Sequence, residues 1–244
     1  MLHSLEHKTS LDGLTWSKDA KLIATGTEDG TLYFWDAKTL KVLNTLKVGS
    51  TINSLQFTKD SQRLVVGGNY QNPDSKTGKT VYTGFSKLID VRQNKVIREY
   101  GENSASVKSV RISKNEQFVG VGSFDRTASI FDIETGKLLH RFEEPHRIEA
   151  VAFSPDNQFF LTGGHGDSVN FYRLSDYQLV HKEPLPRTEY IHFSDDGRLL
   201  LTAHEDSGLL ALHLLISDTQ AKQGFYQKMA DKQLNNKDLQ SGKN

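Results

Sequence analysis

Five polar side chains recur at one position of a phrase that is repeated along this 244-residue chain. The phrase is a short apolar run ending in an aromatic residue or Ile and then Ser or Thr; four residues before that aromatic residue or Ile stand Asp12, Asn53, Lys108, Glu149 and Glu189. Carboxylate and amide oxygens are ligands for hard divalent cations such as Ca²⁺. The four members that carry oxygen could therefore hold a cation that activates water, as in a metal-dependent hydrolase.

A second set of side chains lies six residues before the same point, and it favours a different chemistry. Its members are Ser10, Thr51, Ser106, Arg147 and Arg187. In a ring of repeats, Arg147 and Arg187 would join Asp12, Asn53, Lys108, Glu149 and Glu189 of the first set in one collar. Its alternating charges, from Arg147, Glu149, Arg187, Glu189 and Lys108, would select a peptide segment through ion pairs. We prefer this binding role over the hydrolase, because Lys108 is a misplaced cation in a metal cage.

Other chemistry finds little support in the composition. The chain has no Cys, which excludes disulfides, thiolate metal sites and cysteine nucleophiles. There is no Gly-x-Ser-x-Gly nucleophile elbow. We therefore expect no catalytic residue, no metal and no cofactor.

The charge balance and hydropathy point to a protein partner. Thirty basic and thirty acidic residues give a formal net charge of zero, which disfavours nucleic acid as a partner. No apolar run approaches the roughly 18 residues of a membrane span, and the opening residues lack the apolar stretch of a secretory signal. We expect a cytoplasmic protein that binds a protein or peptide and no membrane.

The repeated phrase defines the elements that must position these side chains. Its occurrences, at 16, 57, 112, 153 and 193, are separated by 41, 55, 41 and 40 residues, which is one period with one insertion. In the first unit, apolar residues run or alternate over 13–16, 21–25, 31–35 and 42–46, with turn residues between them. Four strands per unit of about 40 residues predict an all-β propeller of four-stranded antiparallel blades.

The first unit carries the residues of a known repeat. Ala24-Thr25-Gly26-Thr27-Glu28-Asp29-Gly30-Thr31 leads into Phe34-Trp35-Asp36, and residues 1–216 resemble the WD-repeat (tryptophan-aspartate repeat) propellers. Later units place Ile89-Asp90, Phe131-Asp132, Tyr172-Arg173 and Leu212-His213 at the dipeptide. The resemblance implies a non-catalytic scaffold that binds partners on the face formed by the loops between its strands.

The resemblance also implies a hydrogen-bond network inside the first blade. His7, Thr25, Asp29 and Trp35 match its four positions, with Asp29 orienting the imidazole while His7 and the Thr25 hydroxyl relay to the indole N–H. Only the first unit has all four residues.

Ring closure is predicted from the two ends of the repeat region. Residues 1–5 align with the fourth-strand segments 42–46 and 138–142, and only three strands follow the fifth phrase. We expect the N-terminal strand to complete the last of five blades, which hides both edges. Closure with a second copy, a truncated chain and unrecognised blades are the alternatives, so the protein is a monomer or closes by self-association.

Two segments depart from the repeat. The insertion, residues 69–84 in the second blade, has the composition of a polar loop; it is either an ornamental loop or extended hairpin, or a partner-binding segment that uses Tyr70 and Tyr82. Residues 217–244 form a polar tail in which Ala221, Phe225 and Met229 are spaced for a short helix.

Overall fold

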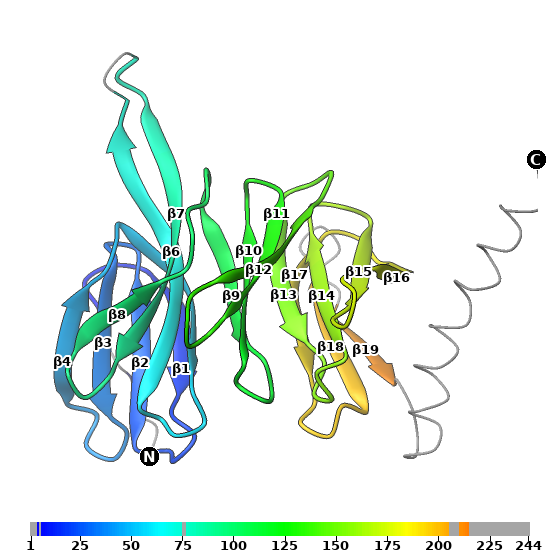
Figure 1. The fold of residues 1–244 in the computed structure, drawn as a ribbon. Coiled ribbons are helices and arrows are strands. Elements are labelled where there is room, and N and C mark those ends of the chain that lie inside the picture. Colours follow the sequence, from blue (N-terminus) through cyan, green and yellow to red (C-terminus); the bar gives the residue numbers. More distant parts are fainter. Residues whose placement is uncertain (1–3, 5, 75–76, 205–209, 215–244) are drawn as a thin grey trace, which may run out of the picture. The chain divides into compact units, whose positions relative to one another are not determined.

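The computed structural model describes residues 4, 6–74, 77–204 and 210–214. The described residues form 19 strands in five sheets, and within each sheet neighbouring strands follow one another along the chain. This confirms the predicted all-β fold, a five-bladed β-propeller of mostly four-stranded antiparallel sheets (Figure 1). No helix among the described residues is long and apolar enough to cross a membrane.

The chain divides into two compact units, Met1–Glu149 and Ala150–Asn244. The first contains blades 1 to 3: β1 (Leu11–Trp16), β2 (Leu22–Thr27), β3 (Thr31–Asp36) and β4 (Val42–Lys47); β5 (Thr51–Phe57), β6 (Arg63–Pro73), β7 (Thr80–Asp90) and β8 (Lys95–Glu99); β9 (Val107–Ile112), β10 (Phe118–Ser123), β11 (Thr127–Asp132) and β12 (Leu138–Glu143). Blades 4 and 5 are β13 (Ile148–Phe153), whose first two residues belong to the first unit, β14 (Phe159–Gly164), β15 (Ser168–Arg173) and β16 (Leu179–Pro184); β17 (Thr188–Phe193), β18 (Leu199–His204) and β19 (Leu210–Leu214).

Blades stack because the first strand of one blade packs against small residues of the blade before it. A Cβ added to Gly26 would lie 2.3 Å from Ile52 Cγ2, and one added to Gly67 would lie 2.6 Å from Val110 Cγ1. These glycines therefore allow a close approach that no larger residue permits. The apolar cores that result run from blade to blade within the first unit.

Blade 1 exposes the face that blades 2 and 3 bury. Leu14 and Trp16 are 57% and 54% exposed, whereas their counterparts Leu55 and Phe57 are 7% and 3% exposed. The predicted closing strand, residues 1–5, lies largely outside the described residues, as does the tail 217–244. Closure of the ring therefore stays a prediction.

The repeated Ser or Thr closes the first turn of every blade. Ser17 Oγ donates to Asp19 Oδ1 (2.7 Å) and accepts the N–H of Leu22 (2.9 Å). The hydroxyl makes the same bond to the side chain two residues on in the other blades: Thr58 with Asp60, Ser113 with Asn115, Ser154 with Asp156 and Ser194 with Asp196. The third residue after each hydroxyl has positive φ: Ala20, Ser61, Glu116, Asn157 and Gly197. The repeat thus encodes a turn conformation as well as a strand.

The insertion is an extension of the hairpin between β6 and β7. Cross-strand pairing continues from Asn69 opposite Gly84 to Pro73 opposite Thr80. Figure 1 shows this ribbon in cyan, running beyond the other strands of its sheet. The consecutive residues Val81, Tyr82 and Thr83 have high β-propensity, which explains why a segment with the composition of a loop pairs as a two-stranded ribbon.

Blade 5 has three strands among the described residues, and its register corrects one alignment. Leu200 pairs with His213 as Ile23 pairs with Trp35. His213-Leu214, and not Leu212-His213, therefore occupies the position of the Trp-Asp dipeptide. The expected alignment was one residue early because blade 5 has neither the aromatic residue nor the Asp that marks the position in other blades.

Candidate functional site

The side chains expected to form the collar lie at the same end of each blade's first strand. In the first unit, Asp12, Asn53 and Lys108 lie on β1, β5 and β9, while Arg147 precedes β13 and Glu149 is its second residue. In the second unit, Arg187 precedes β17 and Glu189 is its second residue. The turns between second and third strands reach the same edge of the sheets, so each position has a turn beside it.

Asn53 links two blades. Its Nδ2 donates to Ser106 Oγ (3.0 Å) and to the carbonyl O of Val107 (2.7 Å). Ser106 Oγ in turn donates to Asn69 Oδ1 (3.0 Å). Because its NH2 group is engaged in this network, Asn53 positions the edge of blade 3.

Asp12 and Lys108 are close enough to interact electrostatically, although they belong to blades 1 and 3. The pKa of Asp12 is raised, mainly because burial disfavours its charged form and also because Glu28 is close; Lys108 acts in the opposite direction. Two carboxylates and one ammonium group thus share this edge of the first unit.

Phe124, which was not among the residues predicted from the sequence, contacts two of the predicted side chains. The Lys108 ammonium lies 5.0 Å from the centre of its ring and the Arg147 guanidinium 5.2 Å from it. Each such contact is worth about 0.5–1 kcal/mol when exposed. Phe124 stands in the turn of blade 3 at the place of Glu28 in blade 1, so an aromatic residue at a turn position that is otherwise polar was the available signal.

We call Asp12, Glu28, Lys108, Phe124 and Arg147 the loop-edge cluster. It combines a half-buried aromatic ring, two cations held against that ring and two carboxylates. Aromatic residues and Arg dominate binding energy at protein interfaces. The cluster has the groups to hold an apolar side chain and a carboxylate of a partner, but no nucleophile paired with a base.

The second unit places its two collar residues differently. Arg187 Nη2 lies 3.1 Å from His165 Nε2, and Glu189 is exposed beside the 42%-exposed Tyr190. Nearby, the buried His204 places Nδ1 2.9 Å from the carbonyl O of Pro186 and Nε2 2.9 Å from Thr202 Oγ1. A neutral imidazole with its proton on Nδ1 satisfies both contacts, which makes His204 a structural residue.

The alternative of a metal cage gains no support from the part of the chain that the structure describes. No group of three His, Cys, Asp or Glu side chains able to hold a metal ion occurs there.

The first-blade network is only partly formed. Trp35 Nε1 donates to Thr25 Oγ1 (2.9 Å), which is the expected final link. His7 packs edge-on against Trp35, with ring centres 5.2 Å apart, but neither of its ring nitrogens has a hydrogen-bond partner among the described residues. Asp29 instead accepts from Thr27 Oγ1 (2.7 Å) and the N–H of Thr31 (3.0 Å), because its short side chain closes its own turn. The relay through His7 is therefore corrected to a packing contact.

The two insertion tyrosines have different environments. Tyr70 is half-buried against Phe85, with ring centres 5.1 Å apart, and Lys87 Nζ lies 5.2 Å from its ring centre. Tyr82 is 49% exposed. Tyr70 thus belongs to the core of blade 2, and Tyr82 alone is available for a contact.

The fold, the repeats and the Trp35-Asp36 dipeptide define the chain as a WD-repeat β-propeller. Residues 3–176 match the family described as nucleolar protein 10-like, N-terminal domain, and the chain belongs to that family. It is similar to the serine-threonine kinase receptor-associated protein of Gallus gallus, 25% identical over 234 residues that cover 84% of this chain and 67% of that protein. For the protein of the same name in Homo sapiens the identity is 25% over 251 residues, 88% of this chain and 70% of the relative.

Another relative is much longer than this chain. The U3 small nucleolar RNA-associated protein 21 homolog of Schizosaccharomyces pombe is 25% identical over 150 residues, which cover 61% of this chain and 15% of that protein.

Proposed function

We propose that this propeller is a non-catalytic interaction scaffold that binds an acidic segment of a protein or peptide at the loop-edge cluster. The observation that carries the proposal is the placement of Lys108 and Arg147 against one ring, that of Phe124. A first strand, a turn of the same blade and the segment before β13 supply these groups. An apolar side chain on the ring, with a neighbouring carboxylate on Arg147, would satisfy this arrangement.

Acidic Asp12 and Glu28 set the limits of such a segment. Both belong to blade 1, and they would repel a carboxylate of the bound segment that lay beside Lys108. The expected segment therefore carries its negative charge toward Arg147 and a neutral or basic group toward Asp12. The exposed Tyr82 on the hairpin extension is a second contact in this proposal.

Names of the relatives suggest the setting. The family name and the yeast relative refer to the nucleolus and to a nucleolar RNA. Two locations are therefore proposed for the protein. One is the cytoplasm, as expected from the sequence, and the other is a nucleolar ribonucleoprotein in which the propeller would contact a protein component. Imaging the tagged chain in a eukaryotic cell separates the two placements. A metal-dependent hydrolase is the second candidate, but the described residues include no group of three His, Cys, Asp or Glu side chains that would favour it.

The test is an affinity capture with crosslinking and peptide mapping. We compare the full chain with Lys108→Glu/Arg147→Glu and with the control Lys18→Glu/Lys137→Glu, which reverses two exposed charges at the opposite edge of the sheets. Loss of one crosslinked acidic segment in the first variant only is the expected result. Equal capture by both variants, or capture that disappears after nuclease treatment, would overturn the proposal, the latter in favour of nucleic acid.

A further inference from the structure

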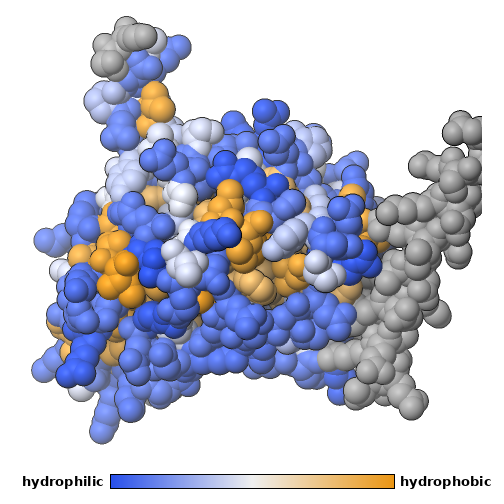
Figure 2. All heavy atoms as spheres, in the orientation of Figure 1, coloured by the Kyte–Doolittle hydropathy of each residue, from blue (hydrophilic) through white to orange (hydrophobic). Residues whose placement is uncertain are grey.

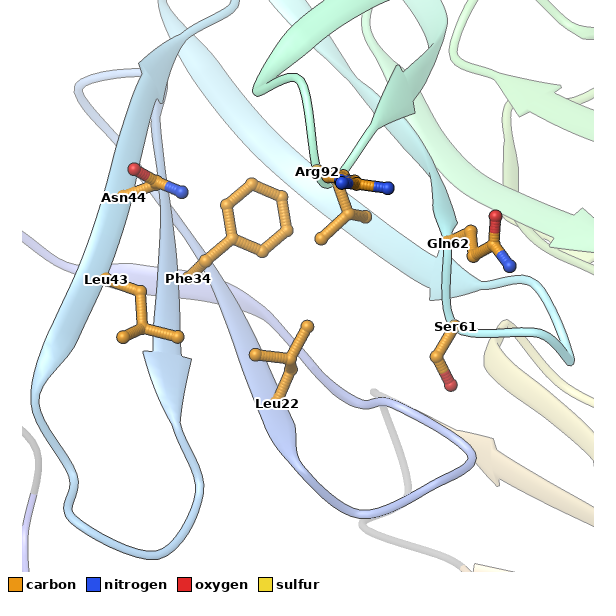
Figure 3. A pocket seen from close by; sticks show the side chains of 8 residues that line it. Leu22, Phe34, Leu43, Asn44, Ser61, Gln62 and Arg92 are labelled. Atoms are coloured by element: carbon orange, nitrogen blue, oxygen red, sulfur yellow. The ribbon is translucent and has the colours of Figure 1, made fainter.

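An apolar groove lies between blades 1 and 2, at the edge of the sheets opposite to the loop-edge cluster. Its volume is about 280 Å³, and it is lined by Leu22, Phe34, Leu43, Asn44, Ser61, Gln62, Val91 and Arg92 (Figure 3). Two hydrogen bonds between the blades hold its walls: Asp19 N–H to Ser61 Oγ (3.3 Å) and Asn94 Nδ2 to the carbonyl O of Thr45 (2.9 Å). The groove is therefore built into the junction of two blades.

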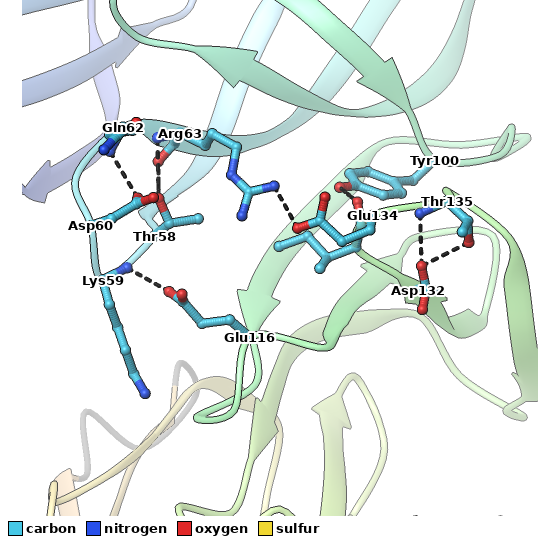
Figure 4. Close-up of polar contacts among 11 residues, drawn as sticks. Thr58, Lys59, Asp60, Gln62, Arg63, Tyr100, Glu116, Asp132, Glu134 and Thr135 are labelled. Atoms are coloured by element: carbon cyan, nitrogen blue, oxygen red, sulfur yellow. Dashed lines mark hydrogen bonds and ion pairs between the residues drawn. The ribbon is translucent and has the colours of Figure 1, made fainter.

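The junction of blades 2 and 3 has the same construction but is filled by the chain itself (Figure 4). There the fully buried Tyr100 donates its hydroxyl to the carbonyl O of Ile133 (3.0 Å). Arg63 Nη1 reaches Glu134 Oε1 at 2.7 Å. An aromatic ring and an ion pair thus close this junction.

Register shows which residues replace them at the groove. In blade 1, Phe34 pairs with Asn44, and in blade 2 the equivalent Leu88 pairs with Arg98. Two residues after Asn44 comes Leu46, and two residues after Arg98 comes Tyr100, so Leu46 occupies the position of Tyr100. Leu22 occupies the position of Arg63, because the backbone carbonyl of each accepts a hydrogen bond from the N–H of the residue five positions earlier, Ser17 or Thr58.

Arg92 stands at the place of Glu134. The residues that precede them, Val91 and Ile133, make equivalent backbone bonds to Gln62 and Gln117. The groove is consequently what remains when a Leu replaces the aromatic side chain and an Arg replaces the carboxylate.

Exposure and charge indicate what the groove accepts. Leu43 is 51% exposed at its rim, which leaves apolar surface in contact with water. Arg92 is exposed, and no ion pair joins it to any other described residue. A space of this size is below that of most small-molecule sites, but it suits one large side chain.

We propose that this groove binds a peptide segment in which an aromatic side chain stands beside a carboxylate. The aromatic side chain enters the groove against Leu22, Phe34 and Leu43, as the Tyr100 ring fills the second junction. The carboxylate pairs with Arg92, reversing the polarity of the Arg63–Glu134 pair. This site is independent of the proposed function, because it lies at the other edge of the blades and uses none of the loop-edge residues.

The test is a titration of the ¹⁵N-labelled full chain, followed by amide chemical shifts, with three synthetic peptides. These are Gly-Ser-Asp-Tyr-Glu-Ser-Gly, the same peptide with Lys in place of Asp and Glu, and the same peptide with Ala in place of Tyr. The acidic tyrosine peptide should shift the amides of Leu43, Asn44, Gln62 and Arg92. The two other peptides should bind at least about tenfold more weakly, through loss of an ion pair plus repulsion, or loss of the buried ring.

Two variants make the test specific. Arg92→Glu should reverse the preference toward the lysine peptide, an outcome that a merely weakened fold would not produce. Leu22→Arg/Leu46→Tyr/Arg92→Glu copies the second junction onto the first and should remain folded but bind none of the peptides. Lys108→Glu/Arg147→Glu should bind the acidic peptide as the parent does, which separates this site from the proposed function.

Absence of binding up to the solubility of the acidic peptide would overturn the proposal. So would shifts confined to other surfaces, or an Arg92→Glu variant with unchanged preference.

Discussion

The indole Nε1 of Trp35 donates a hydrogen bond to Thr25 Oγ1, at 2.9 Å, inside blade 1. Thr25 and Trp35 are 1% and 6% exposed, so water cannot replace either partner. Thr25→Val should therefore leave a buried donor unsatisfied and lower the free energy of unfolding by about 1–3 kcal/mol. Thr25→Ser keeps the hydroxyl and serves as the control. Urea unfolding of the two variants measures the difference, and equal midpoints would contradict the prediction.

His7 should make the stability of blade 1 depend on pH. Burial lowers the pKa of His7, with Asp29 opposing this in part, so the folded state favours the neutral imidazole. The stabilisation is fully present above the unfolded pKa of about 6.5 and decreases as the pH falls through that value toward the lower folded pKa.

His7→Phe keeps the ring packing and should reduce this loss of stability between neutral pH and about pH 5. The comparison must be with the parent chain, because burial also lowers the pKa of His140 and gives it a pH dependence of the same sign in both proteins. Urea unfolding at three pH values measures the slopes, and identical slopes would show that His7 is not responsible.

Tyr100 closes the junction of blades 2 and 3. Its ring is fully buried, and its hydroxyl donates to the carbonyl O of Ile133. Tyr100→Phe should cost about 1 kcal/mol, the net value of one hydrogen bond, whereas Tyr100→Ala should cost about 3–5 kcal/mol because it also leaves a cavity. Burial raises the pKa of the Tyr100 phenol, so an ultraviolet titration should show it ionising later than ordinary tyrosines. Similar losses for both variants would contradict this account.

Trp16 reports on closure of the propeller. The chain has two tryptophans, so Trp35→Phe leaves Trp16 as the one fluorescent indole. Ring closure predicts that the exposed face carrying Leu14 and Trp16 is covered in solution. Acrylamide should then quench Trp16 several-fold less in the folded protein than in urea. Equal quenching in both states would leave blade 1 uncovered and contradict closure; light scattering at several concentrations separates closure within one chain from self-association.

Sequence alone was sufficient for the repeat, the four-stranded blade and the hydroxyl at each first turn. These features are local: strand alternation, turn residues and the spacing of Trp35 from Thr25 are all set within one unit of about 40 residues. The equivalence of the candidate collar positions from blade to blade follows from the same period, whereas their role in binding stays a prediction.

Tertiary structure decided which of those residues meet. Lys108 and Arg147 converge on the ring of Phe124, although no period in the sequence relates these three residues. His7 contacts Trp35 without a hydrogen bond, and Tyr70 turns into the core while Tyr82 faces water. The groove exists because Leu46 and Arg92, from neighbouring blades, stand where Tyr100 and Glu134 stand one junction later. Contacts between blades depend on the shapes of two surfaces at once, which the pattern of one repeat does not contain.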